Sequence, residues 1–353
     1  MQANKGEWSE LYALLSIFAN NKVPAADKDL NPTGDEYIFL QVLRDDTGER
    51  LIYDLEQEGV VVICEKLGQA LKTVSTKGLS DKTKAIFKRI KEGGDTATFS
   101  IPEAITLMDE FELEKIKANS GKKSDLVAIV KDKIASQQEL GFSIKSQAGN
   151  PATLLNASKQ TNFTYKVSNF SGDIDEVNSI DSKSKIRDRI KYILDNGGTF
   201  AFAGLSSQTF TKNLMMIDTV LPNIMAEILF QFYLGNGPAV KDLCEIDGIG
   251  SEYGLDKRSV GFKVKTLLRA IALGMVPSQE WDTYLSTYGG YIIVKDDGAL
   301  VCYHLYNDDQ FKDYLFESTK FETPDSKRHE FGKLYEKDGE LYFDLNIQIR
   351  FIK

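Results

Sequence analysis

An aspartate and a lysine lie on two neighbouring runs of strand-forming residues in the middle of the chain. Asp125 opens the run at 124–131 (SDLVAIVK), and Lys145 lies in the run at 139–146 (ELGFSIKS), after a polar turn. If the two strands pair, the carboxylate and the ammonium can converge on one spot. Phosphodiester hydrolysis needs such a pair, because hard oxygen ligands hold Mg²⁺ and a cation serves the scissile phosphate and the attacking water. A structural ion pair would look the same in the sequence.

The second run carries further polar residues in the alternating pattern of a strand. Ser143, Lys145 and Gln147 alternate with other residues, so their side chains are expected on one face. Gln147 has two interpretations. It either orders the attacking water or hydrogen-bonds a neighbouring strand.

The beginning of the chain predicts a helix that carries another carboxylate. Residues 6–20 place one apolar stripe at helical spacing, formed by Trp8, Leu11, Leu14, Leu15 and Phe18. Glu10 lies beside this stripe, at the edge of the protein rather than in open water, and is therefore a second candidate metal ligand. The alternative is that Glu7 and Glu10 only place negative charge in a first helical turn, where the helix dipole favours it.

The remaining pattern predicts an α/β protein of the mixed α+β kind, with helices packed on sheets. Residues 37–43 and 50–55 flank a turn and indicate a β-hairpin. Helical patterns are expected at 65–72, 81–91, 101–117, 182–195, 213–234 and 260–273. No βαβ regularity of a Rossmann or barrel fold is present. A glycine-rich loop at 235–254 marks the expected domain boundary.

Composition excludes several classes of protein. The 353 residues carry a net charge of −9, and 42% of them are hydrophobic, which supports a sizeable core and rules out wholesale disorder. No apolar run reaches the roughly 18 residues of a membrane-spanning helix, and the N-terminus lacks the layout of a signal peptide. We therefore expect a soluble, cytoplasmic protein without a membrane partner.

The same composition limits metal and nucleic-acid chemistry. Three distant cysteines argue against structural zinc and disulfides, and the two histidines, His304 and His329, exclude a histidine-rich metal site. A net negative chain binds nucleic acid poorly unless cations gather locally. Four basic runs provide such cations, at 115–123, 183–191, 257–269 and 327–333. Each run is either a solvated helix face or part of a groove for a polyanion.

Several segments resemble the HpaII family of type II restriction endonucleases. They are GEWSELYALL at the start, SDLVAIV and ELGFSIKSQAGNPATLLNAS in the middle, and GGYIIVKDDGALVCYHLYN with TPDSKRHEFGKLYEKDGELYFDLNIQIRF at the end. The resemblance runs from about Lys5 to the C-terminus. It implies a PD-(D/E)xK nuclease core, which is a central mixed sheet flanked by helices, with additional N- and C-terminal elements.

This resemblance assigns roles to individual residues. Asp125 and Lys145 correspond to the D and K of the core, and Glu10 corresponds to its first-helix glutamate. Ser143 replaces the usual acidic residue two positions before the lysine, as in S-x-K variants of this superfamily. The third metal ligand is therefore left among Glu139, Glu10 and a backbone carbonyl.

The resemblance also implies the reaction and its partners. The expected enzyme is a type II site-specific deoxyribonuclease that uses Mg²⁺ to break both strands of double-stranded DNA at a short palindromic GC-rich site, with CCGG as the candidate. Residues 1–235 would form the nuclease domain and residues 236–353 the DNA-recognition region. Equivalent cuts on two strands favour a homodimer or sequential nicking by one active site. A cognate DNA methyltransferase would complete the restriction system.

The C-terminal region offers side chains that could read the target. Lys327, Arg328 and His329 lie together, and Arg350 follows near the end. An arginine can fork onto O6 and N7 of guanine. Arg350 has a second interpretation, the solvent-reaching end of a terminal strand. Two other functions fit the sequence, namely a repair or junction nuclease directed by DNA structure, and a DNA-binding regulator that does not cut.

Overall fold

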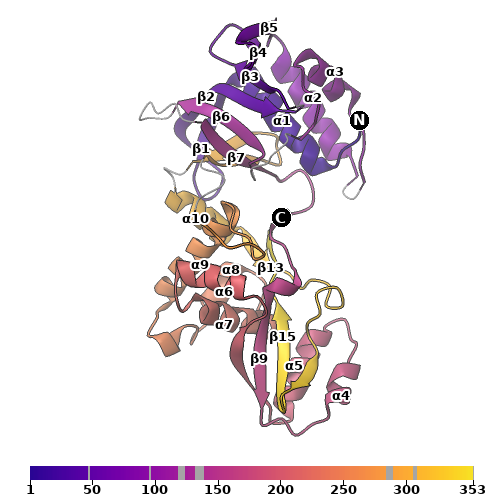
Figure 1. Ribbon diagram of the computed structural model, residues 1–353, viewed down its shortest axis with the longest axis vertical. Helices are drawn as coiled ribbons and strands as arrows, with labels where there is room; N and C mark the ends of the chain where they lie inside the picture. Colours follow the sequence, from indigo (N-terminus) through magenta and orange to yellow (C-terminus); the bar gives the residue numbers. More distant parts are fainter. Residues whose placement is uncertain are drawn as a thin grey trace. The chain divides into compact units, whose positions relative to one another are not determined.

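A computed structural model of the protein describes residues 1–46, 48–94, 97–117, 124–131, 139–283, 289–304 and 308–352 (Figure 1). By its internal contacts the chain divides into two compact units. Unit 1 comprises Met1–Ala152 and Leu285–Tyr314, and unit 2 comprises Thr153–Tyr284 and Leu315–Ile352. Each unit is therefore assembled from two separate stretches of the sequence.

The division does not follow the expected boundary at residues 235–236. The glycine-rich segment lies inside unit 2, where it connects α7 (Leu221–Leu234), α8 (Val240–Cys244) and α9 (Lys257–Ala272), which contact one another. Gly235 ends α7 with a φ of +99°, a left-handed conformation that suits glycine. These glycines therefore form helix ends and turns within one unit rather than a linker.

Unit 1 is built on a mixed sheet. In pairing order its described strands are β1 (Lys22–Ala26), β12 (Leu300–Tyr303), β11 (Gly290–Val294), β7 (Glu139–Ser146), β6 (Leu126–Lys131), β2 (Pro32–Asp45), β3 (Arg50–Asp54), β4 (Val60–Cys64) and β5 (Gln69–Val74). β7 runs parallel to β11, and β1 runs parallel to β12, whereas the other neighbours are antiparallel. Because β1 also pairs with β2, the strands from β1 round to β2 form a closed ring.

The helix α1 (Lys5–Asn20) lies against this sheet, α2 (Leu79–Glu92) packs on α1, and α3 (Pro102–Glu110) packs on α2 (Figure 1). α1 contacts β1, β7 and β11, and it also packs on α2. The predicted apolar stripe is buried, because Trp8, Leu11 and Leu15 are all 0% exposed. Glu7 forms a capping box with Asn4, with both hydrogen bonds at 3.0 Å, and this fixes the start of α1.

The expected hairpin and three of the expected helices are confirmed. The helix expected at 101–117 ends at Glu110, and the one expected at 213–234 is two helices, α6 (Gln208–Ile217) and α7. β2 and β3 pair antiparallel, and α2, α5 (Lys185–Asp195) and α9 occupy predicted helical positions. Residues 65–72, expected to be helical, form a turn and the beginning of β5. Leu67 and Leu71 have helical spacing but are 61% and 49% exposed. These leucines do not pack into the hydrophobic core, and pairing with β4 makes residues 69–74 a strand.

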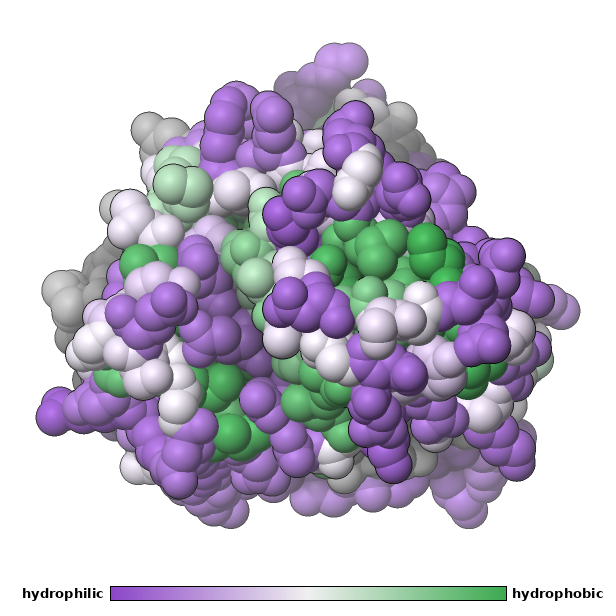
Figure 2. All heavy atoms as spheres, turned by 90° about the horizontal axis from the view of Figure 1, so that it is seen from below, coloured by the Kyte–Doolittle hydropathy of each residue, from purple (hydrophilic) through white to green (hydrophobic). Residues whose placement is uncertain are grey.

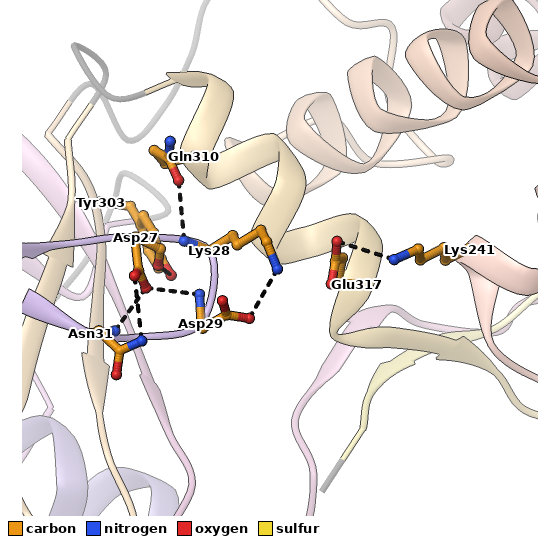
Figure 3. Close-up of polar contacts among 8 residues, drawn as sticks. All are labelled: Asp27, Lys28, Asp29, Asn31, Lys241, Tyr303, Gln310 and Glu317. Carbon is orange, nitrogen blue, oxygen red and sulfur yellow. Dashed lines mark hydrogen bonds and ion pairs between the residues drawn. The ribbon is translucent and has the colours of Figure 1, made fainter.

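The turn between β1 and β2 is tied to the second stretch of unit 1 (Figure 3). Tyr303 of β12 donates its hydroxyl to the Asp27 carbonyl. The Lys28 N–H donates to the Gln310 side-chain oxygen at 3.2 Å. These bonds connect the closed ring to the beginning of α10 (Asp308–Glu317).

Unit 2 contains two antiparallel sheets and the remaining helices. The described strands of the larger sheet are β10 (Thr199–Leu205), β9 (Asn162–Ser168), β15 (Glu340–Asn346) and β14 (Leu334–Lys337), in pairing order. The smaller sheet contains β13 (Thr319–Phe321), β16 (Ile349–Phe351) and β8 (Thr153–Leu155). The other helices are α4 (Ile174–Ser179) and α6 (Gln208–Ile217). Lys241 of α8 pairs with Glu317 at the end of α10 at 3.2 Å (Figure 3).

Unit 2 leaves several large apolar side chains on its surface. Met215 and Met216 of α6 and Phe262 of α9 are 46%, 54% and 64% exposed. On the face drawn in Figure 2, hydrophobic residues gather in patches among hydrophilic ones. Within the described residues no single helix is long and apolar enough to cross a membrane. By length and composition, only the sharply bent pair α6–α7 meets that condition.

Candidate active site

The strands β6 and β7 pair as predicted and fix the Asp125 carboxylate. They run antiparallel with Leu126 opposite Phe142, and the Asp125 N–H donates to the Phe142 carbonyl at 2.8 Å. Asp125 Oδ2 accepts two hydrogen bonds from β7, one from Ser143 Oγ at 2.9 Å and one from the Ile144 N–H at 2.8 Å. Ser143 thus orients the aspartate, and the carboxylate is held on β7.

Lys145 lies on β7 at the same end of the strand as Ser143. Its Nζ is 5.7 Å from the centroid of the Tyr291 ring. β11 runs parallel to β7 with Tyr291 opposite Ser143, so the tyrosine reaches the face that carries the lysine. Tyr291 is only 2% exposed, and burial raises the pKa of its hydroxyl. The neutral ring therefore helps to hold the ammonium through a cation–π contact.

Glu10 of α1 belongs to the same site. Its side chain is 16% exposed, and burial together with the nearby Asp125 charge raises its pKa to about 7. Lys117 Nζ lies 3.8 Å from Glu10 Oε1. Glu10 Oε2 is buried without a hydrogen-bond partner among the described residues. Because an unsatisfied buried carboxylate oxygen is costly, this atom is suited to accept a cation.

The site therefore offers two carboxylates to a metal, Glu10 and Asp125. In the part of the chain that the structure describes, no three His, Cys, Asp or Glu side chains gather at one point. Mg²⁺ is usually held by one or two carboxylates with water and substrate phosphates completing its shell. The donor set thus fits Mg²⁺ and does not resemble the nitrogen and sulfur ligands of zinc.

Two other expected site residues form contacts outside this group. Glu139 is the first residue of β7, four residues before Ser143 and therefore about 13 Å from it along the strand. Its carboxylate pairs with Arg50 at 2.7 Å, so it is not brought to the site as a third ligand. Gln147 lies just beyond β7, and its side-chain oxygen accepts from the Asp296 N–H at 3.2 Å. This bond matches the second interpretation of Gln147, contact with a neighbouring strand.

Sequence reasoning missed two residues of the site, Lys117 and Tyr291. Lys117 belongs to the basic run 115–123, of which residues 118–123 lie outside the described residues. Its charge was a usable signal, but nothing in the sequence connected it to Glu10. Tyr291 gave no signal, because its place depends on the pairing of β11 with β7, which are far apart in the chain.

The residues expected to read DNA lie in unit 2. A turn at 326–330 carries three of them, Lys327, Arg328 and His329. The Asp325 carboxylate organises this turn by accepting from the N–H groups of residues 327 and 328, at 2.9 and 2.8 Å. Arg350 lies on β16, and its Nε is 2.8 Å from the Glu322 carboxylate. Three of the four residues therefore lie together in one turn, and the fourth, Arg350, forms an ion pair with Glu322.

The whole chain matches one protein family. The model of the HpaII restriction endonuclease family matches residues 4–351, and the chain belongs to that family. The chain is also 36% identical to the type II restriction enzyme HpaII of Haemophilus parainfluenzae over 354 residues. This similarity covers 99% of the chain and 98% of that enzyme. No solved structure matches the chain significantly.

The family match confirms the resemblance expected from the sequence. It also confirms the class of enzyme expected with it, because a restriction endonuclease is a hydrolase that acts as a site-specific deoxyribonuclease. The mixed sheet with flanking helices agrees with the expected α+β architecture.

Proposed function

We propose that the protein is a Mg²⁺-dependent type II restriction endonuclease that breaks both strands of DNA at a short palindromic GC-rich site, with CCGG as the candidate. The observation that carries the proposal is the buried Glu10 carboxylate. Its Oε2 has no hydrogen-bond partner among the described residues, and the negative charge of Asp125 contributes to its raised pKa. The family match favours this function over a structure-directed repair or junction nuclease and over a regulator that does not cut.

The proposed metal ligands are Glu10 and Asp125, on the PD-(D/E)xK pattern that the sequence resembles. Glu10 would contribute Oε2, and Asp125 would contribute Oδ1, which accepts no hydrogen bond from the described residues. Bound Mg²⁺ supplies positive charge that stabilises the negative charge developing on the phosphate. Ser143 serves as a positioning residue, because its hydroxyl fixes the other Asp125 oxygen.

Lys145 would act on the substrate itself. Its ammonium stands over the Tyr291 ring and offers a fixed positive charge to the scissile phosphate or the attacking water. Preorganised charges of this kind are effective because they need no rearrangement during the reaction. Tyr291 is therefore a positioning residue for Lys145 in this proposal.

Double-strand cleavage at a palindrome needs either one active site that nicks the two strands in turn or two equivalent active sites. A homodimer whose two-fold axis coincides with that of the DNA supplies them, and this is the assembly we propose. A restriction enzyme would also cut the same sequence in its host. We therefore propose a cognate DNA methyltransferase as the partner that protects the host DNA.

The proposed function is tested by digesting unmodified plasmid in Mg²⁺ and mapping the ends by run-off sequencing. All ends should fall at one short palindrome, Mn²⁺ should replace Mg²⁺, and Ca²⁺ should support binding without cutting. Undiminished digestion in excess EDTA would contradict the metal site. Cutting that follows branched or damaged DNA irrespective of sequence would favour the repair nuclease, and binding without cutting would favour the regulator.

A further inference from the structure

Two basic runs that lie far apart in the sequence meet at one pocket of unit 2. Lys183, just before α5, joins Lys185 and Arg187 of its first turn, and the segment after β13 contributes Lys327. Together with neighbouring residues they line a surface pocket of about 520 Å³ that is open to solvent on one side. Lys185 also pairs with Asp181 at 2.9 Å. The pocket therefore joins the runs 183–191 and 327–333, which sequence reasoning could only treat separately.

The lining of this pocket is positive although the chain carries a net charge of −9. Its acidic residue is Asp325, whose carboxylate already accepts from the N–H groups of residues 327 and 328. These hydrogen bonds hold the pKa of Asp325 below its usual range. Lys183, Arg187 and Lys327 form no ion pair with any residue that the structure describes.

The wall of the pocket includes a buried tyrosine, and one of the cations packs against this wall. Tyr233 is 4% exposed and donates its hydroxyl to the Asn346 carbonyl at 2.9 Å, with Phe232 beside it in the lining. Arg187 packs against Gly235, where a Cβ would come within 2.5 Å of the guanidinium carbon. The guanidinium therefore lies against the end of α7, although Arg187 is exposed to solvent.

We propose that this pocket binds a phosphodiester group of the DNA backbone. Cations gathered in a concave site repel one another, and a phosphate relieves this repulsion while accepting their hydrogen bonds. Arg187 can contact two phosphate oxygens at once, and the lysines contribute point charges. The proposal rests on the proposed function, because DNA is taken as the source of the phosphate.

Such a contact positions unit 2 on the duplex without reading bases. Phosphate contacts fix register and orientation, whereas specificity comes from base edges. Loss of the contact should therefore weaken cognate and scrambled DNA alike. This signature separates the pocket from the neighbouring Arg328, which is a candidate for reading guanine.

The test compares Lys183→Gln/Arg187→Gln and Lys327→Gln with wild type in titrations of cognate and scrambled duplex in Ca²⁺ at several salt concentrations. The double variant should raise Kd on the order of tenfold on both duplexes at low salt. The plot of log association constant against log salt concentration should become less steep, by about 0.9 for each cation removed. Lys191→Gln is the matched control, because this exposed lysine lies on the same helix outside the pocket. It should change neither quantity.

Other results would overturn the proposal in distinguishable ways. A loss confined to cognate DNA would make the pocket a base-reading site. Unchanged DNA binding, together with thermal stabilisation by inorganic phosphate in wild type and not in the variants, would make it a site for free anions. Unchanged DNA binding without that stabilisation would remove the site altogether. Failure of wild type to bind either duplex would instead contradict the proposed function itself.

Discussion

Glu10 must be ionised to bind a metal ion, but its ionisation destabilises the fold. Burial and the Asp125 charge raise its pKa from 4.5 to about 7, so a proton occupies this carboxyl over much of the range in which an ordinary glutamate is ionised. Its Oε2 lacks a donor among the described residues. A cation would satisfy that atom and displace the proton, so we expect metal binding to weaken as the pH falls below about 7.

Glu10→Gln should make the metal-free protein more stable at pH 8. The pKa of Glu10 in the folded protein lies above its ordinary value, so the protonated side chain stabilises the fold. This contribution of Glu10 to the free energy of unfolding is fully present below pH 4.5 and is lost as the pH rises through 7. The loss amounts to about 3 kcal/mol at most, and a neutral glutamine avoids it. Thermal melts in EDTA at pH 5 and pH 8 should therefore show a steeper decline for wild type than for the variant.

Two comparisons separate this effect from a general change in stability. Glu139→Gln removes an exposed carboxylate and should retain the wild-type pH dependence. Mg²⁺ added at pH 8 should raise the Tm of wild type but not that of Glu10→Gln. Identical pH dependence in wild type and Glu10→Gln would show that Glu10 is not a buried ionisable carboxyl.

At the scale of elements, the site depends on β7 and its neighbours. β6 brings Asp125, β11 brings Tyr291, and α1 lies across β7 with Glu10. β11 begins at Gly290, which has a φ of +106°. A Cβ at this position would lie 1.9 Å from the Tyr303 carbonyl oxygen on β12, so only glycine lets the two strands pair.

Gly290→Ala should therefore lower the free energy of unfolding by more than about 3 kcal/mol, because backbone must move to admit the methyl group. Gly34→Ala is the matched control. Gly34 also has a positive φ, +90°, but nothing lies within 4 Å of its added Cβ. Backbone strain alone should cost that variant about 1 kcal/mol. Chemical denaturation measures both values, and equal losses would contradict the close β11–β12 approach.

Local patterns in the sequence predicted the elements that carry the site, and non-local pairing decided the rest. The apolar stripe predicted α1, and alternation predicted the strands that bear Asp125 and Lys145. Spacing could not show that Glu139 lies at the far end of its strand beside Arg50. Tyr291 entered the site only through the parallel pairing of β11 with β7. The segment 65–72 has apolar residues at helical spacing, but the sequence pattern does not show whether those residues are buried. They are exposed, and the segment is not helical.

At the scale of the whole molecule, the two units alternate along the chain, in the order unit 1, unit 2, unit 1 and unit 2. A single boundary placed by a glycine-rich loop could not predict two interleaved units. The proposed chemistry lies in unit 1, and the residues proposed to read and hold DNA lie in unit 2. Substitutions in the two units should therefore have different consequences for cutting and for binding.

Arg328→Ala should weaken cognate binding by about 1–3 kcal/mol if its guanidinium forks onto guanine, with a much smaller loss on scrambled duplex. Arg350→Ala should behave likewise if that residue leaves Glu322 to reach a base. Titrations of both duplexes in Ca²⁺ at two salt concentrations measure this. Equal losses on the two duplexes would identify backbone contacts, and no loss on either would leave the C-terminal segment a structural role.

The most direct test of the proposed active site compares Mg²⁺-dependent cleavage by Asp125→Asn and Glu139→Gln. Both substitutions remove one negative charge from the neighbourhood of β7 with little change in shape, and melts and Ca²⁺ binding establish that each variant folds and binds DNA. Asp125→Asn should cut on the order of 10²–10⁴-fold more slowly, as should Lys145→Ala, while Glu139→Gln should cut like wild type. Near wild-type cutting by folded Asp125→Asn, or an equal loss in Glu139→Gln, would contradict the site.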